Sequence, residues 1–300
     1  MRHEVGGDWG VYLKYFNEMG KVPLSEFFSF YYITIDIGYY VLGALIYQLG
    51  GSIHIANLAY AFVSIIGLYI FSKQFKNRDY VFLLYYPYVI VIFAMGYTRQ
   101  SVAVSLILIS LVIVHSKFKS VMVSLLALTF HKSVLLLNIF HIRSIKSLIL
   151  FLFFSIGMLV IFNDTFNTLH TNYIKSGKAS AGFYYRLALL SPLLLIFALS
   201  RRTRVFLKTN NPIEVSYFYN TFILFILILG LSTLSTNVAD RFLIVLMIFI
   251  FPYVIHLIAV QGKSDHAFYV FLLWSYNVGS LLVWFLTANN AESWLPYQFF

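Results

Sequence analysis

The chain has 300 residues, of which 60% are hydrophobic, 19% aromatic and only 11% charged. Apolar runs of about 20 residues recur along it, the length that crosses a bilayer as a helix. The absence of cysteine excludes disulfides, thiolate nucleophiles and cysteine-based zinc sites. The formal net charge of +10 is expected in cytoplasmic loops rather than on a surface for nucleic acid. We therefore expect an all-α, polytopic integral membrane protein that binds no nucleic acid.

The first residues, 1–12, are polar and glycine-rich, and we expect them to be non-helical. Glycines on both sides of Asp8 and Trp9 indicate a tight loop with an exposed carboxylate, and a frayed terminus is the alternative. No cleavable signal peptide is apparent, so the first span would itself direct the protein to the membrane.

Residues 27–50 form an apolar, aromatic segment that Asp36 and Gly38 interrupt. A carboxylate inside a full span would be costly. The segment is therefore expected either to dip into the membrane and return or to lie along its surface.

The clearer spans follow Gly50-Gly51. They cover residues 53–72, 79–96, 98–115, 144–162, 183–200, 214–234, 240–260 and 266–288. With the irregular segments they predict about 8–10 transmembrane helices. No soluble domain, low-complexity tract or repeat interrupts the series, so we predict a single transmembrane domain over residues 1–300.

Basic loops set the orientation. Of the 21 lysines and arginines, 12 lie in five short loops that we expect to be cytoplasmic. They are Lys73, Lys76, Arg78, Lys117, Lys119, Arg143, Lys146, Arg201, Arg202, Arg204, Lys208 and Lys263. The outer face would then hold the N-terminus, the loops 96–99, 163–182 and 235–240, and the tail from residue 289.

Residues 118–142 begin and end near cytoplasmic loops, so they should cross the membrane an even number of times. A re-entrant helical hairpin with its tip at Phe130-His131-Lys132-Ser133 satisfies this parity. Such irregular backbone at membrane depth is tolerated where it lines protein or a water-filled cavity. The alternative is one straight helix, with one of the later spans removed.

Arg99, Arg186 and Arg241 each lie at the outer end of a predicted span. The simplest interpretation is that each side chain reaches the lipid headgroups. Three at one face, joined by His131 and Lys132 from the hairpin tip, instead predict an anion site. Guanidinium groups bind phosphate oxygens in a bidentate fork, so a pyrophosphate is the anion expected.

Transfer of a sugar also requires a base that removes a proton from the attacking hydroxyl. His131 suits this role by its intrinsic pKa, and Asp8, Asp36 and Asp240 compete with it. A lone histidine in an apolar segment is more often structural, but the neighbouring Lys132 favours function. Tyrosines near the outer face are candidates for stacking on sugar rings, namely Tyr97, Tyr173, Tyr184 and Tyr185. The chain has no phosphate-binding glycine loop followed by Lys-Ser/Thr, no HExxH and no GxSxG.

Four short motifs resemble those of the EpsG family, the Wzy-like polymerases of bacterial surface polysaccharides. Gly7-Asp8-Trp9 with Tyr12 resembles its G-D-[WY]-x-x-Y, and Arg99-Gln100-Ser101-Val102-Ala103 its R-Q-x-x-A at a helix start. Phe130-His131-Lys132-Ser133 resembles F-H-x-S. Asp36-Ile37-Gly38-Tyr39 is similar to E-P-G-[FY], with Asp for Glu and Ile for Pro.

The resemblance implies an outer-face glycosyltransferase that polymerises oligosaccharide repeat units linked to undecaprenyl pyrophosphate, in a bacterial cytoplasmic membrane. The expected partners are this substrate and membrane lipid, with a chain-length regulator protein as a candidate, and no cofactor or metal is expected. The expected catalytic residues are His131 and Asp8. Among the expected pyrophosphate ligands, Arg99 comes from the resemblance, while Arg241, Arg186 and Lys132 come from their positions in the sequence described above. The other expected substrate contacts are Gln100, Tyr97, Ser133 and Asp36.

Three alternatives stay open. A related enzyme could ligate glycan or add a sugar from a lipid phosphate donor. A flippase for lipid-linked oligosaccharides also needs buried cations, but transporters tend to show repeated halves with matching broken helices. We find one interruption and no counterpart in the second half. A scaffold without activity does not explain charges kept inside apolar segments.

Overall fold

The computed structural model describes residues 9–28, 36–75, 77–142, 146, 149, 151, 153, 157, 180–199, 212–259 and 266–287. Helices account for most of these residues and no strand occurs among them, which confirms the predicted all-α class. Four helices in the described part of the chain are long and apolar enough to cross a membrane, which confirms a polytopic membrane protein. They are α4 (Ile53–Ser72), α12 (Pro212–Leu234), α13 (Thr236–Ala259) and α14 (His266–Thr287).

The remaining helical elements are shorter or contain irregular turns. They are α1 (Trp9–Met19), η1 (Leu24–Phe28), α3 (Ile37–Gln48), α5 (Arg78–Tyr85), the π-helix η2 (Tyr86–Ala94), α6 (Thr98–Val112), α7 (Lys117–Phe130), the 3-10 helix η3 (Lys132–His141) and α10 (Ala181–Leu199). Most of the predicted span 144–162 lies outside the described residues, and the count of about 8–10 spans stays a prediction.

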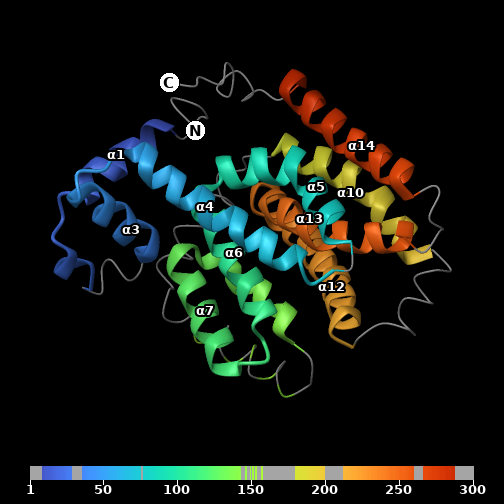
Figure 1. Ribbon diagram of the computed structural model, residues 1–300, viewed down its shortest axis with the longest axis horizontal. Coiled ribbons are helices and arrows are strands. Elements are labelled where there is room, and N and C mark those ends of the chain that lie inside the picture. The colour runs from blue at the N-terminus through green and yellow to red at the C-terminus, as the bar shows by residue number, and fades with distance from the viewer. Residues whose placement is uncertain are drawn as a thin grey trace. The chain divides into compact units, whose positions relative to one another are not determined.

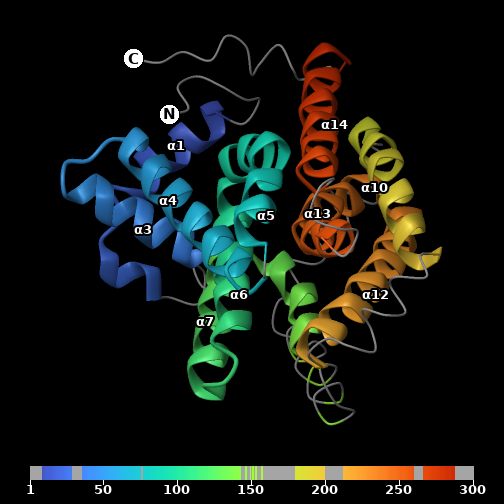
Figure 2. The same cartoon turned by 45° about the vertical axis from the view of Figure 1, so that its right-hand side comes forward.

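The helices group into two compact units (Figure 1, Figure 2). The first unit draws on the segments 1–71, 90–137 and 282–300, and the second on 72–89 and 138–281. The single domain predicted over residues 1–300 stays a prediction beside this division.

In the first unit, α6 and α7 form an antiparallel pair (Figure 1, Figure 2). Buried serines join the two helices, since Ser120 donates a hydrogen bond to the Ser110 carbonyl at 2.8 Å and Ser124 donates to the Ser110 hydroxyl at 3.1 Å. On the other side, Ser105 of α6 donates to the Ser64 carbonyl of α4 at 2.9 Å. A Cβ on Gly67 would lie only 2.4 Å from Ser105 Cβ. Small residues and interhelical hydrogen bonds thus replace the hydrophobic effect that lipid cannot supply between helices.

The N-terminal helix differs from the sequence-based expectation. Residues 1–8 lie outside the described part, but α1 begins at Trp9, so the non-helical character predicted up to Tyr12 is wrong from Trp9 onward. The physical reason is tertiary packing. Tyr12, Tyr15 and Phe16, at helical spacing, place their rings against tyrosines of α3 at centroid distances of 6.1, 5.8 and 5.5 Å. This packing outweighs the low helix propensity of Gly10.

Helix α3 has 12 residues, about 18 Å in length at 1.5 Å per residue, which is too short for a hydrocarbon core of about 30 Å. Both expectations for this segment, a dip or a surface helix, therefore stay open. The turn that follows requires glycine, because Gly50 has a φ of 78° and a Cβ on Gly51 would lie 2.8 Å from the Ile46 carbonyl oxygen.

Helix α7 ends where the hairpin tip was predicted. Phe130 is its last residue, His131 is extended with φ −163° and ψ 124°, and η3 begins at Lys132. The break in the helix is therefore at the expected position, while the re-entrant path stays a prediction.

The core of the second unit is α13, which is apolar on all sides from Phe242 to Ile255. In the most apolar part of this helix, 89% of the residues are buried, whereas the same share is 33% in α12 and 17% in α14. The outer loop predicted at 235–240 is wrong, because α12 ends at Leu234 and α13 begins at Thr236. Ser235 alone joins them, and its hydroxyl accepts a hydrogen bond from the Val238 amide at 3.5 Å as an N-cap. Asp240 and Arg241 thus lie in the first turns of a helix.

Large apolar side chains face outward along several helices. On α4 they recur every three or four residues, at Ile55, Leu58, Phe62, Ile65 and Tyr69, with exposures of 38–64%. Soluble proteins rarely expose a continuous apolar face of this kind. It fits a helix whose outer side contacts lipid.

Candidate functional site

The charged centre of the first unit is an ion pair between α3 and α6. Arg99 Nη1 lies 3.1 Å from Asp36 Oδ2, and the side chains are 31% and 13% exposed. Asp36 directly precedes α3 but makes no side-chain hydrogen bond to cap it, so its carboxylate is available to the arginine. Arg99 is the second residue of α6. The pair explains how each charge is tolerated in a largely apolar chain.

Two tyrosines cover the guanidinium group. The Arg99 Cζ lies 5.6 Å from the ring centroid of Tyr12 on α1 and 5.8 Å from that of Tyr39 on α3, both within cation–π range. We name Tyr12, Asp36, Tyr39 and Arg99 the Arg99 centre. Aromatic rings from α1 and α3 thus lie close to the guanidinium group, and the Asp36 carboxylate neutralises the charge of Arg99.

The end of α7 packs against the start of α3. A Cβ on Gly38 would lie 2.3 Å from Thr129 Oγ1 and 3.0 Å from the Phe130 ring, so only glycine fits this position without a shift. The contact places Phe130, the first residue of the hairpin tip, against the residue that precedes Tyr39 of the Arg99 centre. Gly38 is therefore the residue that joins two of the sequence motifs in space.

At the hairpin tip, the Ser133 backbone N–H donates a hydrogen bond to Nδ1 of His131 at 3.3 Å. An acceptor nitrogen carries no proton, so the neutral imidazole holds its proton on Nε2. His131 in this arrangement offers a donor at Nε2 rather than a second lone pair.

Two buried polar oxygens beside these residues have no hydrogen-bond partner among the described residues. Gln100, on the first turn of α6, is 3% exposed, and its Oε1 accepts no hydrogen bond there. The Ser133 hydroxyl is likewise buried without a partner. A buried polar group without a partner is costly, which is typical of a site that a ligand completes.

The second unit holds a separate buried ion pair, between Arg186 of α10 and Asp240 of α13. Arg186 Nε also donates to the Tyr88 hydroxyl at 2.9 Å, and the Ser180 hydroxyl donates to Asp240 Oδ2 at 3.0 Å. The two charged side chains are only 3% and 9% exposed. Gly182 leaves room for the pair, since its Cβ would lie 3.0 Å from Asp240 Oδ2.

The structure thus brings together some of the expected site residues and leaves others apart. Asp36, Arg99, Gln100 and the hairpin tip all lie in the first unit, where Asp36 pairs with Arg99 and Phe130 packs on Gly38, while Arg186 and Arg241 belong to the second. Two further expected residues, Asp8 and Tyr173, lie outside the described residues. The Tyr97 ring lies 6.3 Å from that of Phe93 between centroids. Tyr184 is 62% exposed, and the Tyr185 hydroxyl donates a hydrogen bond to the Ser280 carbonyl.

Sequence reasoning did not identify Tyr12 and Tyr39 as neighbours of Arg99, or Asp36 as its partner. The available signal was the balance of charge, because Asp36 and Arg99 both stand in apolar surroundings and each needs a counter-ion. For Arg186 the signal was Asp240, next to Arg241 in the sequence.

These features define a polytopic helical membrane protein whose motif residues converge on one partly exposed arginine. The chain belongs to the EpsG family, whose profile matches residues 1–299. Family membership assigns the protein to polysaccharide biosynthesis in the membrane, in a polymerase-type role. No curated protein and no solved structure matches the chain.

Proposed function

We propose that the protein is an outer-face glycosyltransferase that joins oligosaccharide repeat units carried on undecaprenyl pyrophosphate. The observation that supports this most directly is the convergence of the family motifs on the Arg99 centre. Tyr12 and Asp36 come from different segments of the sequence and meet around one guanidinium group, and the end of α7 at the hairpin tip packs against Gly38, two residues after Asp36. A cluster assembled in this way serves recognition of a ligand rather than a single helix contact.

The pyrophosphate of the donor lipid binds Arg99 in place of Asp36. A carboxylate and a phosphate present the same oxygen geometry to a guanidinium, and the pyrophosphate carries more charge and offers a bidentate contact. Arg99 is 31% exposed on its side chain, so a ligand can reach it. Its place at the start of α6 adds the partial positive charge of the helix N-terminus. Lys132, the first residue of η3 at the hairpin tip, supplies a second cation.

In the proposed reaction, Asp36 and His131 have different roles in proton transfer and hydrogen bonding. When pyrophosphate displaces Asp36 from Arg99, the freed carboxylate accepts the proton of the acceptor hydroxyl. The hydroxyl oxygen bonds to the anomeric carbon, the bond from that carbon to the phosphate oxygen breaks, and undecaprenyl pyrophosphate leaves with its negative charge on Arg99. His131, with its proton on Nε2, donates a hydrogen bond to the phosphate instead of acting as the base.

Complementation of a deletion strain tests the function. The lipid-linked glycans of the deletion should be single repeat units on the outer face, and the wild-type gene should restore the longer products. Arg99→Ala should restore none while the protein stays in the membrane. Arg78→Ala, an exposed arginine paired with Asp79, is the matched control and should restore them fully. Single units trapped on the inner face would identify a flippase and refute the polymerase.

A further inference from the structure

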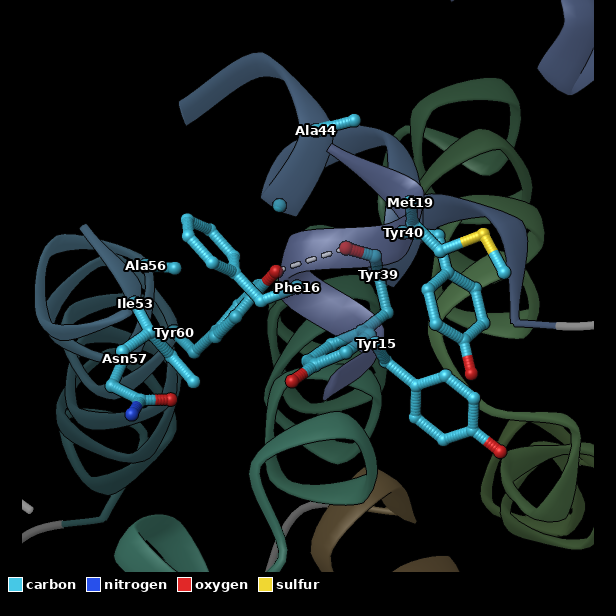
Figure 3. A pocket seen from close by; sticks show the side chains of 11 residues that line it. Tyr15, Phe16, Met19, Tyr39, Tyr40, Ala44, Ile53, Ala56, Asn57 and Tyr60 are labelled. Carbon is cyan, nitrogen blue, oxygen red and sulfur yellow. Dashed lines mark hydrogen bonds between the residues drawn. The ribbon is translucent and has the colours of Figure 1, made fainter. Parts of the chain in front are cut away.

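Tyr60 of α4 is buried, with 1% of its surface exposed, and it packs directly on a residue of the Arg99 centre. Its ring stacks on that of Tyr39 at a centroid distance of 4.6 Å with an angle of 22° between the planes. Its hydroxyl donates a hydrogen bond to the Tyr39 backbone carbonyl at 2.9 Å (Figure 3). One residue thus holds both the side chain and the backbone of the tyrosine that lies 5.8 Å from Arg99 Cζ.

The Tyr60 hydroxyl reaches the backbone of α3 because no side chain stands in its way. Gly43 lies one turn after Tyr39 on α3. A Cβ on Gly43 would lie 3.2 Å from the Tyr60 hydroxyl oxygen, so a larger residue there would require the hydroxyl to move. The approach of α3 to α4 therefore fits this hydrogen bond.

Helix α4 is also joined to the helix that carries Arg99. Ser64 lies one turn after Tyr60 on α4 and donates a hydrogen bond to the Tyr60 carbonyl at 2.8 Å. The same hydroxyl lies 3.0 Å from the hydroxyl of Ser101 on α6, two residues after Arg99. Because α4 contacts α3 through Tyr60 and α6 through Ser64, it fixes the position of Tyr39 relative to Arg99.

The position of Tyr39 matters most when the substrate is bound. In the proposed reaction the pyrophosphate displaces Asp36, so Arg99 loses its carboxylate partner while the two tyrosine rings stay beside it. Of these rings, that of Tyr39 is buried, whereas Tyr12 lies on α1, none of whose described residues is buried. A bidentate contact with phosphate requires a fixed guanidinium plane. The buried ring is the one suited to fix it.

We propose that Tyr60 is a positioning residue, which orients Arg99 for the pyrophosphate by holding Tyr39 in place. Tyr60 itself touches neither the substrate nor the guanidinium group, and its effect passes through the stacked ring. The proposal rests on the proposed function, because it takes Arg99 as the ligand of the pyrophosphate.

Two substitutions separate the two contacts of Tyr60. Tyr60→Phe removes the hydrogen bond and keeps the stacked ring, whereas Tyr60→Leu removes both. The probe is undecaprenyl pyrophosphate, whose binding to the purified protein in nanodiscs is measured well below the unfolding temperature of each variant. Tyr60→Phe should weaken binding about fivefold, as expected for one hydrogen bond, and Tyr60→Leu about 25-fold, since the aromatic pair is lost as well.

Tyr85→Phe is the matched control for an effect on stability alone. Tyr85 is also fully buried, and its hydroxyl donates a hydrogen bond to a backbone carbonyl, that of Ile248, at 2.9 Å. Both of these residues belong to the second unit. Tyr60→Phe and Tyr85→Phe should therefore lower the unfolding temperature by similar amounts, but only Tyr60→Phe should weaken binding of undecaprenyl pyrophosphate.

A double-mutant cycle with Arg99 tests the route of the effect. In protein that carries Arg99→Ala, addition of Tyr60→Phe should not weaken the remaining binding further, because the residue through which Tyr60 acts is gone. Further weakening by about the same fivefold would show that Tyr60 acts independently of Arg99, and would refute the positioning role.

The outcomes separate this proposal from the proposed function. If wild-type protein binds the lipid, Arg99→Ala weakens that binding and both Tyr60 variants bind normally, the positioning role is wrong and the pyrophosphate role of Arg99 stands. If Tyr85→Phe weakens binding as much as Tyr60→Phe does, the effect is one of stability, and the positioning role is again wrong. If wild-type protein does not bind the lipid, or if Arg99→Ala leaves binding unchanged, the proposed function fails and the positioning role with it.

Discussion

Removal of Arg186 should destabilise the protein far more than removal of an exposed arginine. The charged side chains of Arg186 and Asp240 are only 3% and 9% exposed. Arg186→Ala would leave the Asp240 carboxylate buried with the Ser180 hydroxyl as its remaining donor among the contacts described above. Breaking a buried pair by removing one partner costs about 3–5 kcal/mol, because it leaves an uncompensated charge. At about 2–4 °C per kcal/mol, the unfolding temperature should fall by about 6–20 °C.

The assay is thermal unfolding of the purified protein in detergent. Arg78→Ala provides the control, since Arg78 and Asp79 form a pair that is 56% and 86% exposed and should contribute less than about 1 kcal/mol. The double variant Arg186→Met/Asp240→Leu removes both charges and keeps the volume, so it should recover most of the lost stability.

The double variant also separates a structural role from a binding role. The sequence places Arg186 among the pyrophosphate ligands, whereas its burial indicates a clamp between α10 and α13. A stable double variant that still polymerises would assign Arg186 to the clamp, and a stable but inactive one would assign it to the substrate. An unfolding temperature that does not change in Arg186→Ala would refute the reasoning from burial.

Three further predictions concern single positions. Arg99→Lys should lower polymer yield about 100-fold, nearly as much as Arg99→Ala, because a lysine cannot form the bidentate contact with phosphate. The yield is measured on gels of surface glycan. Full yield with lysine would rule out bidentate phosphate binding as the role of Arg99. His131→Gln should keep measurable activity, since its amide can donate from about the position of Nε2, whereas His131→Asn should not; loss of activity in both variants would favour histidine as the base. Gly67→Ala should lower the unfolding temperature, because the added Cβ would lie 2.4 Å from Ser105 Cβ. Gly230→Ala is the control and should not lower it, since a Cβ there would have nothing within 4 Å. Equal effects at both glycines would show that the close approach of α4 to α6 does not contribute to stability.

The long helices could be predicted well from the sequence because hydropathy alone determines them. The predicted span 53–72 coincides with α4, and the predicted spans 214–234 and 266–288 differ from α12 and α14 by one or two residues at an end. The loop predicted at 235–240 was wrong because Ser235 and Thr236 are polar for a different reason, as the cap and first residue of a helix. Composition cannot distinguish a polar helix start from a polar loop.

The candidate site could be predicted only in part. The motif positions Arg99 and His131 stand out because ionisable residues are rare in apolar segments. Their neighbours are harder to assign, since Tyr12 and Tyr39 each end a short motif but nothing in the sequence places either of these two among 23 tyrosines beside Arg99. The role of Gly38 was equally hidden, because its meaning depends on Thr129, some ninety positions away in the sequence. Contacts between distant segments are set by packing, which a single sequence does not display.

The serines of α6 have a consequence for how the protein enters the membrane. Helix α6 has 15 residues, and three of them, Ser101, Ser105 and Ser110, are buried serines. A segment this short and this polar inserts poorly as a lone helix, because it is shorter than the hydrocarbon core and its Ser105 hydroxyl finds its acceptor, the Ser64 carbonyl, on another helix. Its partners are synthesised at different times, α4 before it and α7 after it. We therefore expect α6 to settle in the bilayer only once α7 has left the ribosome, so that Arg99 is positioned late in biogenesis.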